Sequence, residues 1–258
     1  MPRTDAFNPV LVHPIPGPPP LALLAAVPAE TRELAAALEN ASELRVGRKA
    51  AVRGELDGRL VLVFATGMGK TNAAHALTAL LEGERVKGVI GFGIGGAYPE
   101  SGLALGDVAL ASEAVYGDDG AETPAGWIDT EAIGIPLLQG VDGTRFNRFP
   151  LDAARVEAAR TALERAGIPA RVGPSVTVSR CSGTGALGRE MAARWGAVCE
   201  GMEGAALAHV AALYGVPFLE VRGVSNRVED RDPSRWRIAE AAAAAQRAVR
   251  VIAASWPP

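Results

Sequence analysis

Two glutamates and one asparagine follow directly after apolar runs of the chain, where acid–base side chains would meet at one edge of a sheet. They are Glu30, Glu203 and Asn226. A glycine-rich turn after Phe92 and the polar segment Ser179–Thr184 follow two further runs. Because ligands of open α/β sheets bind outside the carboxyl ends of the strands, we expect these five segments to form one site. A lone glutamate near a helix start is more often a capping residue, so the shared placement carries this expectation.

Two glycine motifs look like nucleotide-binding loops, and each lacks a feature that such loops require. TGMGKT (Thr66–Thr71) ends in Gly-Lys-Thr, but a P-loop needs a glycine at position 64, where the chain has Phe64. GFGIGG (Gly91–Gly96) matches G-x-G-x-x-G, but AYPESG follows it in place of the helix of a dinucleotide site. We interpret the first motif as a strand-to-helix turn and the second as backbone that approaches a ligand closely.

Short apolar runs alternate with amphipathic Ala/Leu-rich stretches, which predicts a single α/β domain over residues 21–258. Continuous apolar runs such as LALLAAV suit strands that are buried on both faces. Strand–helix alternation predicts a central mixed, mostly parallel sheet flanked by helices. The predicted strands are Leu21–Val27, Arg59–Ala65, Gly88–Phe92, Asp107–Ser112, Ala170–Ser179, Ala197–Glu200 and Pro217–Val224. The predicted helices are Ala29–Asn40, Lys70–Leu81, Leu151–Ala166, Met202–Tyr214 and Arg235–Ala254.

Two segments fall outside this alternation. Residues 1–20 are rich in proline, and we expect them to form an arm along the surface or along a neighbouring subunit. The Gly/Pro-rich stretch Tyr116–Phe149 is expected to be an excursion beside the active site, because connections of that length in a compact domain are usually functional.

The composition excludes several classes of protein. The 258 residues carry a net charge of −3, which lacks the basic footprint of a nucleic-acid binder. Cys181, Cys199 and the three histidines lack the spacing of a zinc site, so we expect no metal and no cofactor. Prolines break the N-terminal apolar stretch, and no run of 18 uncharged apolar residues follows. We therefore expect a cytoplasmic protein with no membrane partner.

A resemblance to a known family rests on five motifs in order. VPAE, TGMGK, GIGG, EGMEGAALAHV and VRGVSN resemble the nucleoside phosphorylase and nucleosidase superfamily from Leu21 to the C-terminus. GGAYPESGLALGDV, GAETPAGW and FLEVRGVSN are most similar to its futalosine hydrolase branch. The resemblance implies hydrolysis of the N-glycosidic bond of futalosine, which releases hypoxanthine and dehypoxanthine futalosine in menaquinone biosynthesis. It also implies a small-molecule purine nucleoside as the binding partner and a homo-oligomer.

The resemblance assigns roles to particular residues. Glu203 matches the carboxylate that accepts hydrogen bonds from the ribose 2′- and 3′-hydroxyls, and Glu30 matches the acidic residue that activates the attacking water. Met202 would pack against the sugar. The remaining substrate-binding candidates are Gly93, Ile94, Gly95, Ser182, Thr184 and Ser225. An arginine should meet the carboxylated aromatic group at the 5′ side of futalosine, and the sequence leaves Arg145, Arg148, Arg180 and Arg227 open for that role.

Asn226 is the position that distinguishes between purines. Adenine-cleaving nucleosidases of the superfamily have aspartate there, whereas an asparagine amide can donate to a 6-oxo group and accept from a protonated N7. A site built for one exocyclic group rejects the other, because the wrong pair leaves buried polar groups unpaired. Asn226 therefore favours hypoxanthine or guanine over adenine. The amide cannot supply a proton, so the proton for N7 must come from water or from another acid.

The glycine turn separates hydrolysis from phosphorolysis. Phosphorylases of the superfamily place a serine or threonine there to hold phosphate, and this chain has Gly93 and Ile94. We therefore predict water as the nucleophile. The alternatives are a 6-oxopurine nucleoside phosphorylase, a methylthioadenosine/S-adenosylhomocysteine-type nucleosidase, and a nucleoside-binding module without catalysis. Arg222 is expected to pair with a carboxylate inside its strand rather than to bind phosphate.

Overall fold

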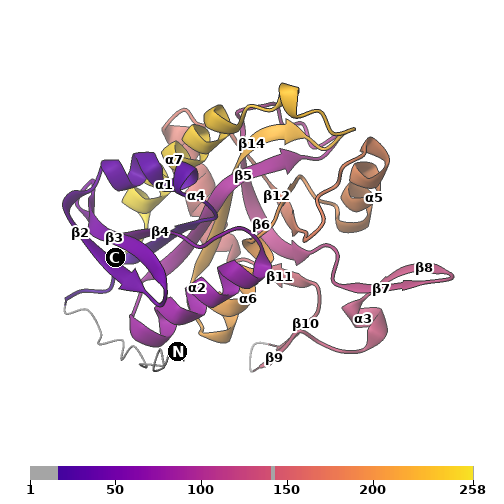
Figure 1. The fold of residues 1–258 in the computed structure, drawn as a ribbon, viewed down its shortest axis with the longest axis horizontal. Coiled ribbons are helices and arrows are strands. Elements are labelled where there is room, and N and C mark those ends of the chain that lie inside the picture. Colours follow the sequence, from indigo (N-terminus) through magenta and orange to yellow (C-terminus); the bar gives the residue numbers. More distant parts are fainter. Residues whose placement is uncertain (1–16, 141–142, 258) are drawn as a thin grey trace, which may run out of the picture.

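The computed structural model describes residues 17–140 and 143–257, in which a mixed sheet has helices on both faces (Figure 1). The strands of the main sheet are β1 (Leu21–Ala25), β2 (Glu39–Val46), β3 (Lys49–Leu56), β4 (Arg59–Ala65), β5 (Gly88–Ala97), β6 (Val108–Tyr116), β11 (Arg148–Pro150), β12 (Ala170–Thr177), β13 (Cys199–Gly201) and β14 (Phe218–Arg227). The helices are α1 (Pro28–Ala36), α2 (Lys70–Gly83), α3 (Thr130–Ile133), α4 (Ala153–Arg165), α5 (Gly185–Trp195), α6 (Gly204–Leu213) and α7 (Ile238–Ser255).

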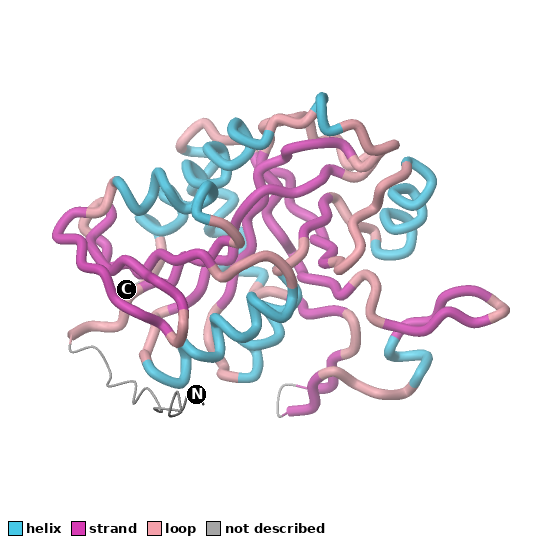
Figure 2. Tube along the Cα trace, in the orientation of Figure 1, coloured by secondary structure: helices cyan, strands magenta, loops and turns pink. Residues whose placement is uncertain are grey.

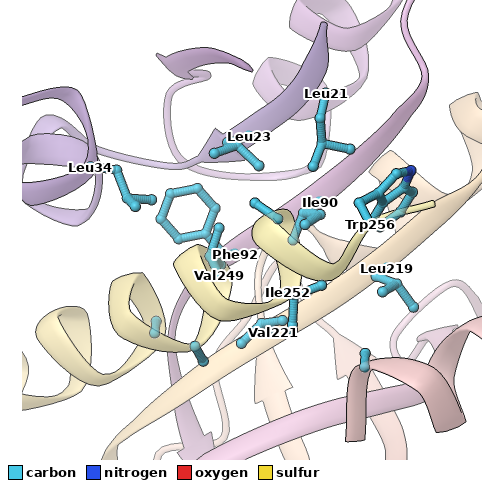
Figure 3. Close-up of a cluster of buried hydrophobic side chains, with 14 of the residues drawn as sticks. Leu21, Leu23, Leu34, Ile90, Phe92, Leu219, Val221, Val249, Ile252 and Trp256 are labelled. Carbon is cyan, nitrogen blue, oxygen red and sulfur yellow. The ribbon is translucent and has the colours of Figure 1, made fainter. Parts of the chain in front are cut away.

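Strand β1 lies at the centre of the sheet, parallel to β4 on one side and to β5 on the other. All five of its residues are buried, as expected for a strand covered on both faces. Leu21 and Leu23 pack into a cluster with α1, α4 and α7, whereas Ala22 and Leu24 pack into a second cluster with α2 and α6. Figure 3 shows the first cluster around Phe92. The alternation of side chains along one strand thus builds both layers of the core.

Five strands of the sheet form a closed ring. Strand β5 pairs with β14, β14 with β6, β6 with β12, β12 with β13, and β13 pairs back with β5. Closure leaves no free edge among these strands and fixes their mutual register. Gly96 in β5 is consequently the register partner of both Glu200 in β13 and Asn226 in β14.

The predicted elements agree with this arrangement where the apolar runs are strong. The strand Arg59–Ala65 has the predicted bounds, and the single α/β domain with a mixed sheet flanked by helices is confirmed. The helix predicted to reach Asn40 ends at Ala36, because strand β2 begins at Glu39. The hairpin of β2 and β3 and helix α5 were not predicted.

The excursion Tyr116–Phe149 contains structure of its own. Its elements are α3 and the hairpins β7 (Gly120–Thr123) with β8 (Gly126–Asp129) and β9 (Leu138–Gly140) with β10 (Gly143–Arg145). Figure 2 shows the β7–β8 hairpin projecting from the body. Asn147 holds the base of the excursion, because its amide donates to the carbonyls of Tyr116 and Asp119 and accepts from Thr130.

The predicted N-terminal arm lies mostly outside the described residues, which begin at Gly17. Within residues 17–20, the carbonyl of Pro18 accepts a hydrogen bond from the guanidinium of Arg53 at 2.9 Å. None of the helices in the described ranges has the length and apolar character that a membrane span requires.

Candidate active site

A cavity of about 720 Å³ opens beyond the carboxyl ends of β1, β5 and β14, as expected for an open α/β sheet. Eight of the ten predicted site residues line it: Glu30, Ile94, Gly95, Ser182, Met202, Glu203, Ser225 and Asn226. These residues come from five different elements or turns. The strand ends therefore bring together side chains that are up to 196 positions apart in the chain.

Glu30 is the third residue of α1 and is fixed by three backbone N–H groups. Its Oε2 accepts from Ala26 and from Val27, each at 3.0 Å, and its Oε1 accepts from Ile94 at 2.8 Å. The bond to Val27 is the reach-back of a capping box, so part of this arrangement serves the helix start. The bond to Ile94 is different, because it joins the carboxylate to strand β5 at the cavity wall.

Gly93 is not among the residues that line the cavity, so its role in substrate binding stays a prediction, but its missing side chain gives room to Glu30. A Cβ on Gly93 would lie 2.5 Å from Oε1 of Glu30, and the residue has φ +153°. A larger residue at this position would displace the carboxylate. The hydroxyl side chain that phosphorylases carry at this turn has no space here.

A buried network of ion pairs holds the carboxylate of Glu203 in place. Its Oε1 accepts from the backbone N–H of Gly69 at 2.9 Å, and its Oε2 accepts from Nη1 of Arg222 at 3.1 Å. Arg222 is 2% exposed, and its Nε donates to Glu220 at 2.9 Å. Burial opposes the charge of Arg222, but the carboxylates of Glu220 and Glu203 outweigh it and raise its pKa. The prediction that Arg222 pairs with a carboxylate inside its strand is confirmed.

The turn TGMGKT reaches the site through backbone and through Lys70. Besides the Gly69 N–H on Glu203, Nζ of Lys70 pairs with Asp118 at 2.5 Å and also with Asp119. Asp118 accepts from the backbone N–H of Ser179 at 2.7 Å. Burial opposes ionisation of Asp118, but Lys70 and the backbone donor outweigh it and lower its pKa. Lys70 thus ties the turn to the segment that precedes Ser182.

Glu200 and Ser182 form the far wall of the cavity. Oε1 of Glu200 accepts from the backbone N–H of Ser182 at 3.0 Å, and its Oε2 accepts from the hydroxyl of Tyr98 at 3.0 Å. Burial raises the pKa of the Glu200 carboxyl. Burial also raises the pKa of the Tyr98 hydroxyl, and the charge of the neighbouring Glu200 adds to this effect. Sequence reasoning missed Glu200, because it is the last residue of a predicted strand.

Asn226 keeps free hydrogen-bonding capacity toward the cavity. Its Oδ1 accepts from the hydroxyl of Ser225 at 2.8 Å, and its Nδ2 donates to the carbonyl of Arg227 at 3.0 Å. An amide oxygen has two lone pairs and an amide nitrogen has two hydrogens, so one of each remains. The single hydroxyl hydrogen of Ser225 is shared between Oδ1 of Asn226 and the carbonyl of Gly95, which lies 3.2 Å away in β5.

Thr184 lies outside the cavity lining, and its role as a substrate-binding residue stays a prediction. Its hydroxyl accepts from the backbone N–H of Leu187 at 3.2 Å and caps the start of α5. The excursion Tyr116–Phe149 is likewise absent from the lining, as far as its described residues are concerned. Phe149 is buried against Tyr116 and His209 of its own chain.

An arginine-rich segment after β14 forms the outer wall. Arg227, Arg231, Arg235 and Arg237 line the cavity together with Trp236. The guanidinium of Arg231 stacks on Trp236 at 4.5 Å, and Arg235 pairs with Glu229 at 2.8 Å. Of the arginines considered for the 5′ group, Arg227 lines the cavity and Arg148 instead pairs with Glu113. The described residues contain no cluster of three or more His, Cys, Asp or Glu placed to hold a metal ion.

Comparisons with known proteins identify relatives of this chain in sequence and in fold. Residues 20–255 match the model of the family described as "Phosphorylase superfamily". The chain is 38% identical over 196 residues to a futalosine hydrolase of Thermus thermophilus, covering 76% of this chain and 82% of that protein. It is 35% identical over 206 residues to a futalosine hydrolase of Streptomyces coelicolor, covering 76% and 81%. Among solved structures, the 5′-methylthioadenosine/S-adenosylhomocysteine nucleosidase of Neisseria meningitidis aligns with a TM-score of 0.77 at 27% identity, covering 90% of this chain and 97% of that one.

Proposed function

This chain belongs to the phosphorylase superfamily, and we propose that it hydrolyses the N-glycosidic bond of futalosine to hypoxanthine and dehypoxanthine futalosine. The observation that carries the proposal is the cavity that brings Glu30, Glu203 and Asn226 together. Both curated relatives described above are futalosine hydrolases and are matched over most of their length.

In the proposed reaction, Glu30 takes a proton from a water that attacks the anomeric carbon. The sugar becomes oxocarbenium-like as the bond to N9 breaks, so a base that is already oriented lowers the barrier. Glu203 accepts from the 2′- and 3′-hydroxyls, and Met202 packs against the sugar. Arg222 and Gly69 hold Glu203 in one orientation. Ser182 and Asn226 face the purine, and the free amide N–H of Asn226 suits a 6-oxo group.

Phosphorolysis is the rival reaction, and two features favour water as the nucleophile. Arg222, the arginine beside Glu30, is already paired with two carboxylates. The position of a phosphate-binding hydroxyl is Gly93, where a side chain would collide with Glu30. The segment 227–237 lines the cavity with four arginines and with Glu229, Asp230 and Asp232. A guanidinium of this segment suits the carboxylate at the 5′ side of futalosine.

The test is hypoxanthine release from futalosine and from inosine, each with and without phosphate. We expect release from futalosine at the same rate in both conditions. Release from inosine that requires phosphate would contradict the proposal and make the protein a phosphorylase. Adenine release from methylthioadenosine at a higher kcat/KM than hypoxanthine release from futalosine would favour the function of the Neisseria structural relative.

Asn226→Asp is expected to shift the ratio of kcat/KM toward adenine nucleosides by about 10- to 100-fold. The aspartate loses the N–H that donates to a 6-oxo group and gains an acceptor for the 6-amino group. The measurement compares futalosine with methylthioadenosine for the variant and for wild type. Asn40→Asp, an exposed change in β2, is the matched control. An unchanged ratio would rule out Asn226 as the purine-selecting residue.

The homo-oligomer and the cytoplasmic location stay predictions. Met68 and Val27 line the cavity while 62% and 41% exposed, so the cavity has an apolar rim. Covering that rim with a second copy of the chain would separate the cavity, with its attacking water, from bulk solvent.

A further inference from the structure

The proposed hydrolysis leaves the proton for the departing purine without a source. When the bond between the anomeric carbon and N9 breaks, its electron pair goes to the purine, and protonation at N7 makes hypoxanthine a neutral leaving group. Asn226 faces the purine end of the cavity, but an amide has no proton to give at neutral pH. The proton must therefore come from water or from an acid that lines the cavity, and Asp230 and Asp232 line it besides Glu200. Asp230 accepts from the backbone N–H of Gly185 at 3.0 Å, and Asp232 accepts from the hydroxyl of Ser234 at 2.6 Å. The inference rests on the proposed function.

The closed ring of strands places one acidic side chain beside Asn226. Gly96 of β5 is the register partner of Asn226 in β14 on one side and of Glu200 in β13 on the other. The position of a Cβ on Gly96 lies 3.2 Å from Nδ2 of Asn226 and 3.6 Å from Cγ of Glu200. The same position lies 2.9 Å from Cγ2 of Val228, so Asn226, Glu200 and Val228 converge on Gly96. Asn226 and Glu200 both line the cavity. Glu30 accepts a hydrogen bond from Ile94, which precedes Gly96 by two residues in β5. At ~3.3 Å per residue, the two positions are separated by about 6.6 Å along the strand.

The surroundings of Glu200 suit a carboxylic acid that holds its proton. The residue is 7% exposed, and burial raises the pKa of its carboxyl. The negative charge of Asp118 acts in the same direction, whereas the bonds from Ser182 and Tyr98 act against it. The thiols of Cys181 and Cys199 are close enough to interact with Glu200, and burial raises the pKa of both. The backbone N–H and the hydroxyl of Ser182 and the hydroxyl of Tyr98 bond to the carboxyl of Glu200, and two carboxyl oxygens have four lone pairs, so acceptor capacity or a proton remains for the cavity.

We propose that Glu200 is the general acid of the reaction and donates its proton to N7 of the leaving hypoxanthine. Water adds to the anomeric carbon as hydroxide while Glu30 takes its second proton, and the bond to N9 breaks. The products are the free sugar, neutral hypoxanthine, protonated Glu30 and ionised Glu200. Transfer of one proton from Glu30 to Glu200 through solvent restores the enzyme. Asn226 then selects the purine, and Glu200 activates its departure.

The test is Glu200→Gln, which keeps the size of the side chain and removes the acid. We expect kcat for futalosine without phosphate to fall by about 10²- to 10⁴-fold. Wild-type kcat/KM should fall as the pH rises through the pKa of Glu200, because only the protonated form donates. The variant should lose this alkaline limb. A residue that only shapes the cavity would lower the rate without removing the limb.

Three further measurements make the outcome decisive. Glu200→Asp keeps the acid, so it should recover part of the rate and keep the alkaline limb even if Glu200→Gln folds poorly. Glu157→Gln, an exposed change in α4, should match wild type. Inhibition by hypoxanthine should stay within about threefold in Glu200→Gln. Retention of wild-type kcat, or an alkaline limb that persists in Glu200→Gln, would overturn the inference. Failure of wild type itself to cleave futalosine would instead overturn the proposed function.

Discussion

Replacing Glu30 by glutamine is expected to lower kcat for hypoxanthine release by about 10²- to 10⁴-fold, with a small change in the Kd of futalosine. Glutamine keeps the shape of the side chain but cannot accept a proton from water. The measurement is single-turnover release of hypoxanthine, together with calorimetric binding of futalosine to the inactive variant. Loss of turnover with retained binding would also exclude a module that only binds nucleosides.

The Glu30 substitution also changes the backbone contacts, so it needs a matched control. The amide nitrogen of glutamine would face the N–H of Ile94 or those of Ala26 and Val27, at a cost of about 1–3 kcal/mol in stability. Glu33→Gln changes an exposed glutamate one turn later in the same helix and should keep wild-type kcat. If Glu30→Gln retains kcat within about threefold of wild type while folded, Glu30 is not the base.

The central part of the fold could be predicted because burial on both faces leaves a strong pattern. Strands β1, β4 and β5 come from unbroken apolar runs, and their predicted starts at Leu21, Arg59 and Gly88 agree with the structure. Strand β2 has no such pattern, because it is an exposed edge strand with the sequence ENASELRV. Its residues therefore extended the predicted helix beyond Ala36. Helix α5 does carry a signal, since Leu187, Met191 and Trp195 recur at helical spacing after the cap Thr184.

The candidate site was predictable where a residue follows a strand, and not where strand register decides. Glu30 follows β1 and Glu203 follows β13, and Asn226 follows the predicted strand Pro217–Val224 although it lies within the longer observed β14; the three meet in one cavity. Glu200 is a strand residue, and only the pairing of β13 with β5 brings it beside Asn226. Thr184 follows a strand as well, but its hydroxyl is used by the start of α5. Placement after a strand therefore identifies candidate site residues, but it does not distinguish residues that cap a helix from residues that bind a substrate.

Arg222 stabilises the sugar-binding end of the site and the core beneath it at the same time. Glu220 is 0% exposed, and burial raises the pKa of its carboxyl although Arg222 acts against this. Close packing fixes the pair, since a Cβ on Gly204 would lie 2.1 Å from Oε1 of Glu220. Glu203 and Glu220 therefore share one counter-charge, the guanidinium of Arg222.

Arg222→Met is therefore expected to lower the free energy of unfolding by about 3–5 kcal/mol at pH 8, because it leaves buried carboxylates without their counter-charge. Without Arg222 the pKa of Glu220 rises further, so the folded state binds more protons than the unfolded state. Stability then falls as pH rises above the ordinary glutamate range, and the loss should be smaller at pH 5 than at pH 8. Urea unfolding at both pH values measures this difference.

The double variant Arg222→Met with Glu220→Gln separates the charge effect from lost packing. Glutamine keeps the shape of Glu220 and removes its charge, so the double variant should be more stable than Arg222→Met alone and should show a weaker pH dependence. We expect both variants to be inactive, because in each of them Glu203 lacks the Nη1 donor that orients it. If both variants are equally unstable at both pH values, packing of the arginine stem rather than its charge stabilises this end of the site.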